Sequence, residues 1–146
     1  MGQQQLLLVI LVTIIVGIAT VVAINTFSSA ADSANVDAAR QDALSIAAAA
    51  QQYYMKPAAL GGGNQSFTGI DFQTVSGVPV ESTTATTTQA SNDNGTYVIS
   101  GANDTEFTLT VYPASCHDGQ PPETSCTDAA DVLTATVVAD GISWTS

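Results

Sequence analysis

Basic side chains are almost absent from this chain. Its 146 residues carry 13 acidic groups against two cations, Arg40 and Lys56, for a formal net charge of −11. Binding to nucleic acid through phosphates needs clustered Lys and Arg, so nucleic acid is not an expected partner. Hydrophobic residues make up 45 % of the sequence, which is too many for a disordered protein. The length suits one domain.

Residues that commonly carry catalysis or bind metals are also scarce. The single histidine, His117, reads as an exposed loop residue, and the sequence contains no G-x-S-x-G, H-E-x-x-H or P-loop motif. The acidic pair Asp128 and Asp131 lacks the alternating Asp/Asn pattern of a calcium loop, so we interpret it as solvated surface. We therefore expect no enzymatic activity, no metal and no cofactor.

No charged residue precedes Asp32, and an apolar run, LLLVILVTIIVGIATVVAI, broken only by Thr13, Gly17 and Thr20, extends from Leu6 to Ile24. As a helix it would span about 29 Å, close to the roughly 30 Å hydrocarbon core of a bilayer. The run is apolar on all sides, so it needs lipid or similar helices around it. It lacks a basic n-region and exceeds a signal-peptide core in length, which disfavours cleavage as a secretory signal. The assembly surface is expected to comprise Leu6, Leu7, Leu8, Val9, Ile10, Leu11, Ile14, Ile15, Gly17, Ile18, Val21, Val22 and Ile24.

The sequence after this run predicts that the helix continues, from about residue 3 to residue 56. Apolar residues recur at steps of three and four, which defines one stripe: Val36, Ala39, Ala43, Ile46, Ala50 and Tyr53. Polar residues mark the opposite face: Asp37, Gln41, Ser45 and Gln52. Pro57 and the glycines 61–63 are expected to end the helix.

The remainder is rich in Thr, Ser, Val and aromatic residues, which favours strands. The predicted strands are Ser66–Phe72, Tyr97–Ser100, Glu106–Tyr112, Val132–Ala139 and Ile142–Thr145. Turns are expected at Gly101–Asp104 and at Asp140-Gly141, and Glu81–Asn94 reads as a polar loop. The predicted fold class is α+β, a long amino-terminal helix packed on a small antiparallel sheet. We divide the chain into an apolar helix (1–25), its amphipathic continuation (26–60) and a strand-rich body (61–146).

Cys116 and Cys126 are the only cysteines. Two cysteines this close in a strand-rich exported domain favour a disulfide that closes a loop; the alternative, a metal pair, lacks further ligands. Three Asn-x-Ser/Thr sequons begin at Asn64, Asn94 and Asn103. They fall in expected loops, so glycans are possible partners of an extracellular body.

The apolar helix, its amphipathic continuation and the small disulfide-containing body together resemble type IV pilins. The segment IVGIATVVAI, Ile15 to Ile24, is similar to the apolar segment of that family. The chain departs from the family pattern in having Gln3, Gln4 and Gln5 where an acidic residue is usual, and Asn25 where a proline falls. Only Met1-Gly2 stands where the family has a basic leader, so whether it is removed stays open. The resemblance implies a divergent pilin-like subunit.

These observations predict a structural protein, a subunit of an extracellular filament that polymerises with identical copies through its apolar helix. Before assembly the helix would lie in the cytoplasmic membrane, and the filament would serve adhesion or surface attachment. The main alternative is a monomeric membrane-anchored surface or binding domain, or a minor pilin-like component. A third, an anchored enzyme, would need a catalytic constellation that the sequence does not show.

Overall fold

A computed structural model describes residues 2–75, 77–78, 80–83, 87–116, 124–126 and 131–145. The chain begins with one long helix, α1 (Gly2–Met55). Two compact units follow one another along the sequence, one up to Ala34 and one from Asn35 to the end. The first consists of helix alone, and the second, which we call the body, contains the rest of α1 and all the strands.

The helix ends where the sequence predicts. Pro57 adopts an extended conformation after Met55, and the chain then folds back to cap the last turn. The amides of Gly63, Asn64 and Gln65 donate to the carbonyls of Tyr53, Lys56 and Tyr54 respectively. Because a side chain at Gly63 would overlap the Ser66 carbonyl oxygen, this return requires glycine. The glycine run therefore serves as a helix-capping turn.

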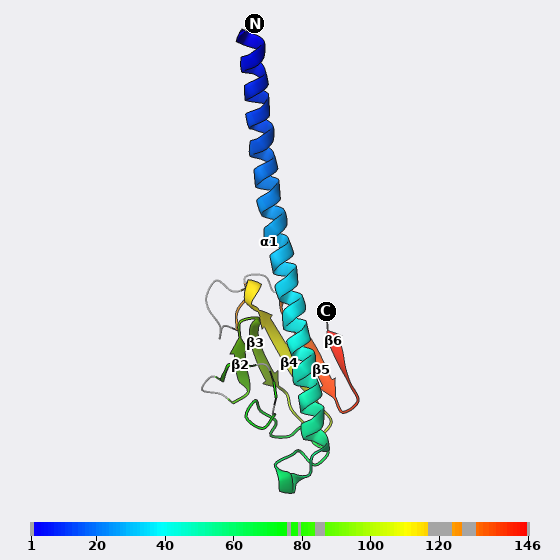
Figure 1. Ribbon diagram of the computed structural model, residues 1–146. Helices are drawn as coiled ribbons and strands as arrows, with labels where there is room; N and C mark the ends of the chain where they lie inside the picture. Colours follow the sequence, from blue (N-terminus) through cyan, green and yellow to red (C-terminus); the bar gives the residue numbers. More distant parts are fainter. Residues whose placement is uncertain are drawn as a thin grey trace. The chain divides into compact units, whose positions relative to one another are not determined.

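Among the described residues, six antiparallel strands form one sheet in which each strand pairs with its neighbours in sequence, β1-β2-β3-β4-β5-β6. Their bounds are β1 (Ser82–Thr83), β2 (Gln89–Asn92), β3 (Gly95–Ser100), β4 (Glu106–Pro113), β5 (Leu133–Val138) and β6 (Gly141–Thr145). Two short 3₁₀ helices, η1 (Ala58–Leu60) and η2 (Ala114–Cys116), follow α1 and β4. The predicted α+β class is confirmed, with the part of α1 that belongs to the body packed on one face of the sheet (Figure 1).

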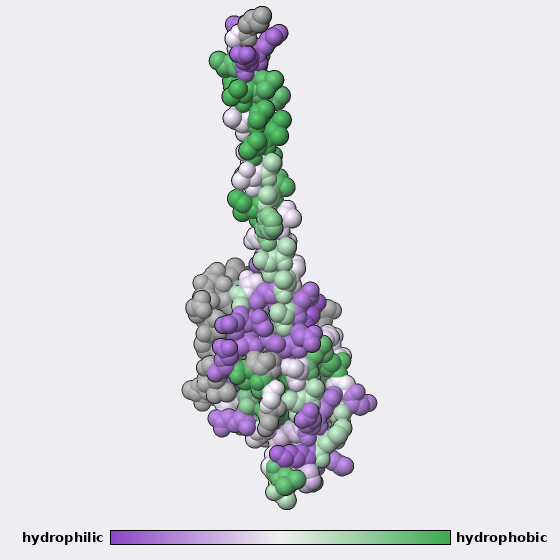
Figure 2. Space-filling view, viewed as in Figure 1, coloured by the Kyte–Doolittle hydropathy of each residue, from purple (hydrophilic) through white to green (hydrophobic). Residues whose placement is uncertain are grey.

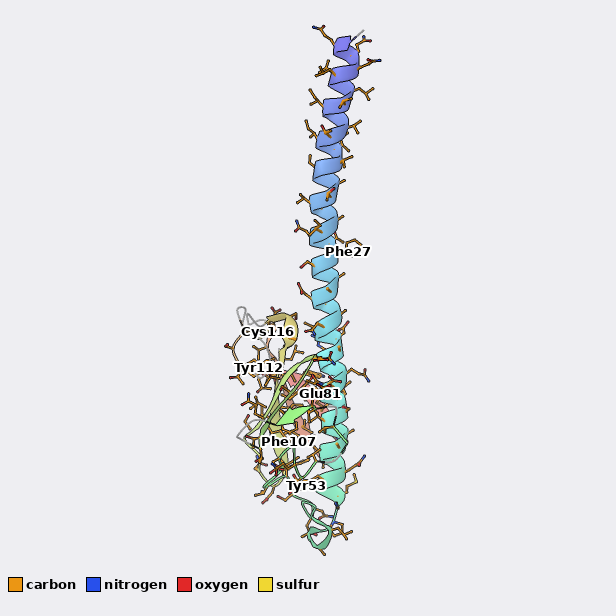
Figure 3. All side chains as sticks on the ribbon, turned by 60° about the vertical axis from the view of Figure 1, so that its left-hand side comes forward. Phe27, Tyr53, Glu81, Phe107, Tyr112 and Cys116 are labelled. Carbon is orange, nitrogen blue, oxygen red and sulfur yellow. A yellow bond between two sulfur atoms is a disulfide. The ribbon has the colours of Figure 1, made fainter. Side chains whose placement is uncertain are left out.

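The core forms between the second half of α1 and the sheet. Residues alternate along β4, with Phe107, Leu109 and Val111 buried and Thr108 and Thr110 half-exposed, as expected for a sheet with one covered face. The buried helix residues are Ala39, Ala43, Ile46, Ala47, Ala49, Ala50 and Tyr53. Figure 3 shows Tyr53 and Phe107 within this packed part. The predicted stripe is thus confirmed, with Val36 only half-buried, and the four predicted polar positions are exposed.

One predicted strand, Ser66–Phe72, is wrong. These residues form turns, because Asp71 Oδ1 accepts hydrogen bonds from the amides of Gln73 and Thr74 and Gly69 has a left-handed φ of 79°. Their apolar side chains are nevertheless buried. The ring centroid of Phe67 lies 4.8 Å from that of Tyr54 and 5.2 Å from that of Phe107, so the segment closes one end of the core without joining the sheet.

The predicted polar loop Glu81–Asn94 is also wrong in part, because it contains β1 and β2. β2 pairs with β3 from Gln89↔Val98 to Asn92↔Gly95, and the strand Tyr97–Ser100 accordingly begins earlier, at Gly95. The turn at Asp140-Gly141 is shifted by one residue. Val138 pairs with Gly141, so Ala139 and Asp140 form the two-residue turn and Gly141 already belongs to β6.

Candidate assembly helix and surface sites

The predicted assembly residues form an exposed apolar surface on the first part of α1. Each large apolar side chain between Leu6 and Ile24 is exposed, from 46 % at Ile10 to 68 % at Leu7. Figure 2 shows a hydrophobic region on the visible face of this part of the helix. Soluble monomers rarely expose a continuous apolar surface of this kind. The helix is long and apolar enough to cross a membrane, and none of its most apolar window is buried.

The few polar groups of this segment bond within the helix. The hydroxyls of Thr13, Thr20 and Thr26 donate to the carbonyls of Ile10, Val16 and Val22, at 2.8, 2.8 and 2.9 Å. Such bonds let Thr enter an apolar environment at small cost. Beyond the run, Phe27 projects from the helix with 76 % of its surface exposed (Figure 3). The segment is therefore chemically suited to lipid or to a bundle of helices.

Gly17 has no structural requirement inside its own chain. A Cβ atom at this position would meet nothing within 4 Å, and glycine in a helix interior costs roughly 0.5–1 kcal/mol relative to alanine. Small residues on an apolar helix let a neighbouring helix approach closely. Gly17 thus forms a notch in the apolar surface that suits a second helix.

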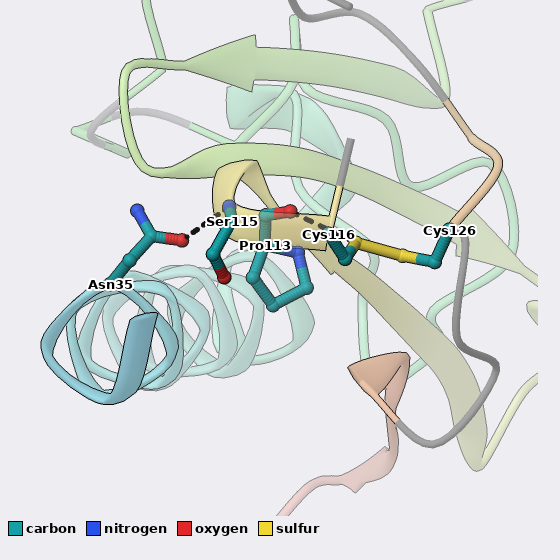
Figure 4. Close-up of a disulfide and its surroundings, with 5 residues drawn as sticks. All are labelled: Asn35, Pro113, Ser115, Cys116 and Cys126. Atoms are coloured by element: carbon teal, nitrogen blue, oxygen red, sulfur yellow. Dashed lines mark hydrogen bonds between the residues drawn. A yellow bond between two sulfur atoms is a disulfide. The ribbon is translucent and has the colours of Figure 1, made fainter. Parts of the chain in front are cut away.

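The disulfide between Cys116 and Cys126 is confirmed (Figure 4). Their Cα atoms lie 4.9 Å apart, within the usual range for such bonds, and Cys116 is buried at the end of η2. The bond occupies both sulfur atoms, so the alternative of a metal pair does not apply. Next to it, the Ser115 amide donates to Asn35 Oδ1 at 2.9 Å (Figure 4), which ties η2 to α1. His117 and Asp128 lie outside the described residues.

The three sequons occupy different environments. Asn64 and Asn103 are exposed, Asn64 with a left-handed φ of 52°. Asn103 Oδ1 accepts hydrogen bonds from the hydroxyl and amide of Thr105. Asn94 is half-buried, and its Nδ2, the atom to which a glycan would be joined, donates to Asp42 Oδ2 at 2.7 Å. The geometry therefore favours Asn64 and Asn103 over Asn94 as glycan acceptors.

A polar cluster centred on Asp42 is a feature that the sequence analysis missed. Asp42 Oδ2 accepts hydrogen bonds from Asn92 Nδ2, Asn94 Nδ2 and the Tyr97 hydroxyl, at 2.8, 2.7 and 2.9 Å. Asn92 Oδ1 accepts the amides of Asn94 and Gly95. One carboxylate thus fastens α1 to the β2–β3 turn. The Asn-x-Asn-Gly pattern at 92–95 was a signal for a tight turn, but nothing in it indicated a partner fifty residues earlier.

Burial raises the pKa of Tyr97 well above its usual value, and the hydrogen bond to Asp42 adds to this effect. Tyr97 is fully buried, so the phenol remains protonated and donates to the carboxylate over the physiological pH range. The cluster is a structural brace in which each named donor has an acceptor.

Beside this brace lies a hollow of about 400 Å³, lined by Asp42, Val78, Val80, Glu81, Asn92, Asp93 and Asn94. Its rim is acidic, but within the described part of the chain no group of three or more His, Cys, Asp or Glu residues is placed to hold a metal ion. The oxygen of Asp42 that faces Asn92 and Asn94 is already used by the brace.

No protein-family model matches this chain, and no curated protein or solved structure is significantly similar to it.

Proposed function

We propose that this protein is the structural subunit of an extracellular, pilus-like filament, polymerised through the apolar surface of α1. One observation carries the proposal: a single helix is apolar and exposed from Leu6 to Ile24 yet is packed on its own sheet further along. The packed half holds a folded body, and the exposed half needs partners of its own kind. The filament displays its acidic bodies at the cell surface for attachment.

Burial energies support this arrangement. Each large apolar side chain contributes on the order of 1.5–3 kcal/mol when fully buried, and the segment presents more than a dozen such side chains. Removal of this surface from water in a central bundle therefore outweighs the ordering of the helix. Before assembly the same segment rests in the membrane, where its length matches the hydrocarbon core. The disulfide and the Asp42 brace keep the body folded outside the cell.

The alternative is a monomeric membrane-anchored surface domain, since the exposed segment is long enough to span a bilayer. Ile15→Asp places an unpaired carboxylate inside the helix bundle and should abolish filaments. A second substitution separates the two functions. Gly17→Ile keeps the segment apolar, and so keeps the anchor, but fills the notch that a neighbouring helix would use.

The experiment is negative-stain microscopy of material sheared from cells, combined with membrane fractionation. Wild type and Asp93→Asn, an exposed body variant, should yield filaments. Gly17→Ile should give few or no filaments while the chain remains in the membrane. Wild-type protein found only as detergent-soluble monomers would contradict the filament and favour the anchored domain.

Glycosylation of the body is part of the same proposal. Sugar is expected on Asn64 and Asn103, which are exposed, and not on Asn94, whose Nδ2 is bonded to Asp42. Peptide mass spectrometry of protein purified from its native cells measures occupancy at each site. Unmodified Asn64 and Asn103 would remove this part of the proposal, and a glycan on Asn94 would contradict the site preference.

A further inference from the structure

Strand β6 is an open edge of the sheet. Among the described strands it ends the strand order and pairs with β5 alone (Figure 1). Among the residues that the structure describes, no backbone hydrogen bond outside the β5–β6 ladder involves Gly141–Thr145. An edge of this kind presents unpaired N–H and C=O groups to another strand.

The usual protections of an edge strand are missing from β6. Its sequence, GISWT, contains no charged residue and no proline, and its pairing with β5 proceeds from Val138↔Gly141 to Thr134↔Thr145 without a bulge. The opposite edge of the sheet is β1, whose described residues are Ser82–Thr83. The usual protections are therefore missing at the edge formed by β6.

The pairing with β5 decides which groups face outward. Gly141 and Val138 flank a two-residue turn and pair directly, so their backbone groups bond each other. Along a strand, successive residues direct these groups to opposite sides. The N–H and C=O groups of Ile142 and Trp144 consequently point to the open edge.

We propose that β6 is a homotypic docking strand, which pairs antiparallel with β6 of a second copy of this chain about a two-fold axis at Ser143. In this register Ile142 of each copy faces Trp144 of the other. Both pairs are hydrogen-bonded pairs, because these are the residues whose backbone groups point outward. The sheets of two bodies then form one continuous sheet.

The side chains of β6 favour a second copy of β6 as the strand that pairs with this edge. On the face covered by α1, the register places Ile142 beside Trp144 twice, and cross-strand pairs of aromatic and β-branched residues are stabilising. Trp144 is 39 % exposed in the single chain although it is a large apolar residue. On the other face, serine meets serine and glycine meets threonine, so each large side chain has a suitable neighbour.

An apolar residue of α1 lies on the same side of the body. Gln51 Nε2 donates to the Val138 carbonyl at 3.2 Å, next to the start of β6. Leu44 precedes Gln51 by two helical turns and so shares its helix face, and its side chain is 42 % exposed. A second copy that docks on β6 would lie near the exposed side chain of Leu44 and could remove part of it from water.

Charge also favours this contact. The chain carries a net charge of −11, so most contacts between two bodies would bring carboxylates together. The five residues of β6 are uncharged, and Asp140 lies in the turn before the strand, outside the paired register. The edge is a place where two copies can approach without like charges meeting.

The contact is independent of the filament. A two-fold contact is isologous and closes on itself, whereas a filament grows by heterologous contacts. In a filament of uniform polarity the β6 contact would therefore join subunits of two different filaments, which makes it a bundling contact. For a chain that does not polymerise, it would produce a dimer.

Cysteine cross-linking of the full-length chain in detergent micelles tests the register. Ser143 would face its own copy across a non-hydrogen-bonded pair, where Cα atoms are about 4.5 Å apart and a disulfide can form. Ser143→Cys should give a covalent dimer on a non-reducing gel under mild oxidation. The matched control is Ser100→Cys, a serine that is also exposed and lies in the same cross-strand row, but on β3, which has a neighbouring strand on each side; it should remain monomeric. Equal cross-linking of the two variants, or none at Ser143→Cys, would overturn the proposal.

Substitutions that place opposite charges at Ser143 test whether the strand that pairs with β6 is a second β6. Ser143→Lys or Ser143→Glu alone should weaken self-association at least tenfold in sedimentation equilibrium, because two like charges would meet at the axis. An equimolar mixture of the two variants should associate again. If each variant alone self-associates as strongly as the wild type, or if the mixture of the two stays monomeric, pairing between two copies of β6 is contradicted. Filament formation by these variants is scored separately, so its loss would not be mistaken for loss of this contact.

Discussion

The two parts of α1 have the same helical conformation but opposite surroundings. Up to Ala34 no residue of the helix is buried, whereas from Ala39 to Tyr53 seven residues are buried against the sheet. Within the exposed part, Leu6–Ile24 is apolar on all sides, whereas the packed part is apolar only on the side that meets the sheet. This difference shows that an apolar pattern specifies the kind of partner a helix needs, while the rest of the chain decides whether that partner is internal. The following predictions concern substitutions where α1 packs against the sheet, because the contacts of each side chain are known there.

The largest effect is expected from Ile46→Ala. Ile46 is fully buried between α1 and the sheet, and truncation of such a residue leaves a cavity that costs about 2–5 kcal/mol of unfolding free energy. The matched control is Ile15→Ala, which truncates the same side chain at a position 56 % exposed. Denaturant unfolding of the body in detergent, followed by Trp144 fluorescence, should show a lower midpoint for Ile46→Ala and no change for Ile15→Ala. Equal midpoints for the two variants would contradict the separation of the two halves.

A smaller loss is expected from Asp42→Ala. The substitution removes the acceptor shared by Asn92, Asn94 and Tyr97, and the loss of hydrogen bonds to a charged group costs about 1.5–3 kcal/mol. Asp37→Ala is the control, since its carboxylate is exposed and only 3.8 Å from Arg40 in a surface pair that contributes little. Thermal unfolding should separate the two variants. An Asp42→Ala body as stable as the control would show that the brace does not stabilise the fold.

The smallest effect depends on pH. Because the pKa of Tyr97 is raised in the folded state, the unfolded chain loses its phenolic proton first, near pH 10. Above that pH the folded state binds more protons than the unfolded state, so the unfolding free energy falls by about 1.4 kcal/mol per pH unit. Below pH 10 this contribution is constant. Tyr97→Phe should remove this alkaline slope, measured by denaturant titration at a series of pH values, and a slope that persists in the variant would assign it to another group.

Much of the fold followed from local patterns. The helix could be predicted almost to the residue, because the 3.6-residue period, the alanine content and Pro57 all agree. The strands β4, β5 and β6 were also predicted, since their apolar residues alternate with Thr and Ser. The disulfide was predicted from the spacing of Cys116 and Cys126 in a strand-rich body, and the structure confirms it.

The errors have a common physical cause. Ser66–Phe72 has the composition of a strand, but the side chain of Asp71 bonds nearby amides and forms a turn instead. Gln89–Asn92 has the composition of a loop, but it becomes a strand because β3 offers a ladder of backbone partners. In both places hydrogen bonds overrode the local propensity and decided the conformation.

The candidate sites divide in the same way. The apolar segment Leu6–Ile24 could be recognised from the sequence because hydrophobicity depends on composition alone. The Asp42 brace could not, because its donors come from Asn92, Asn94 and Tyr97, and no periodicity relates those positions to a helix residue.

The sequence by itself therefore determined the helix, its apolar and amphipathic halves, the disulfide and most strands, because each depends on neighbouring residues or on short-range spacing. Only the tertiary structure decided that the Asp42 carboxylate accepts three side-chain hydrogen bonds, that the Nδ2 of Asn94 is bonded, and which strand remains at the open edge. Those features arise from contacts between segments far apart in the chain, where a hydrogen bond or an unpaired edge exists only after the sheet has formed against α1.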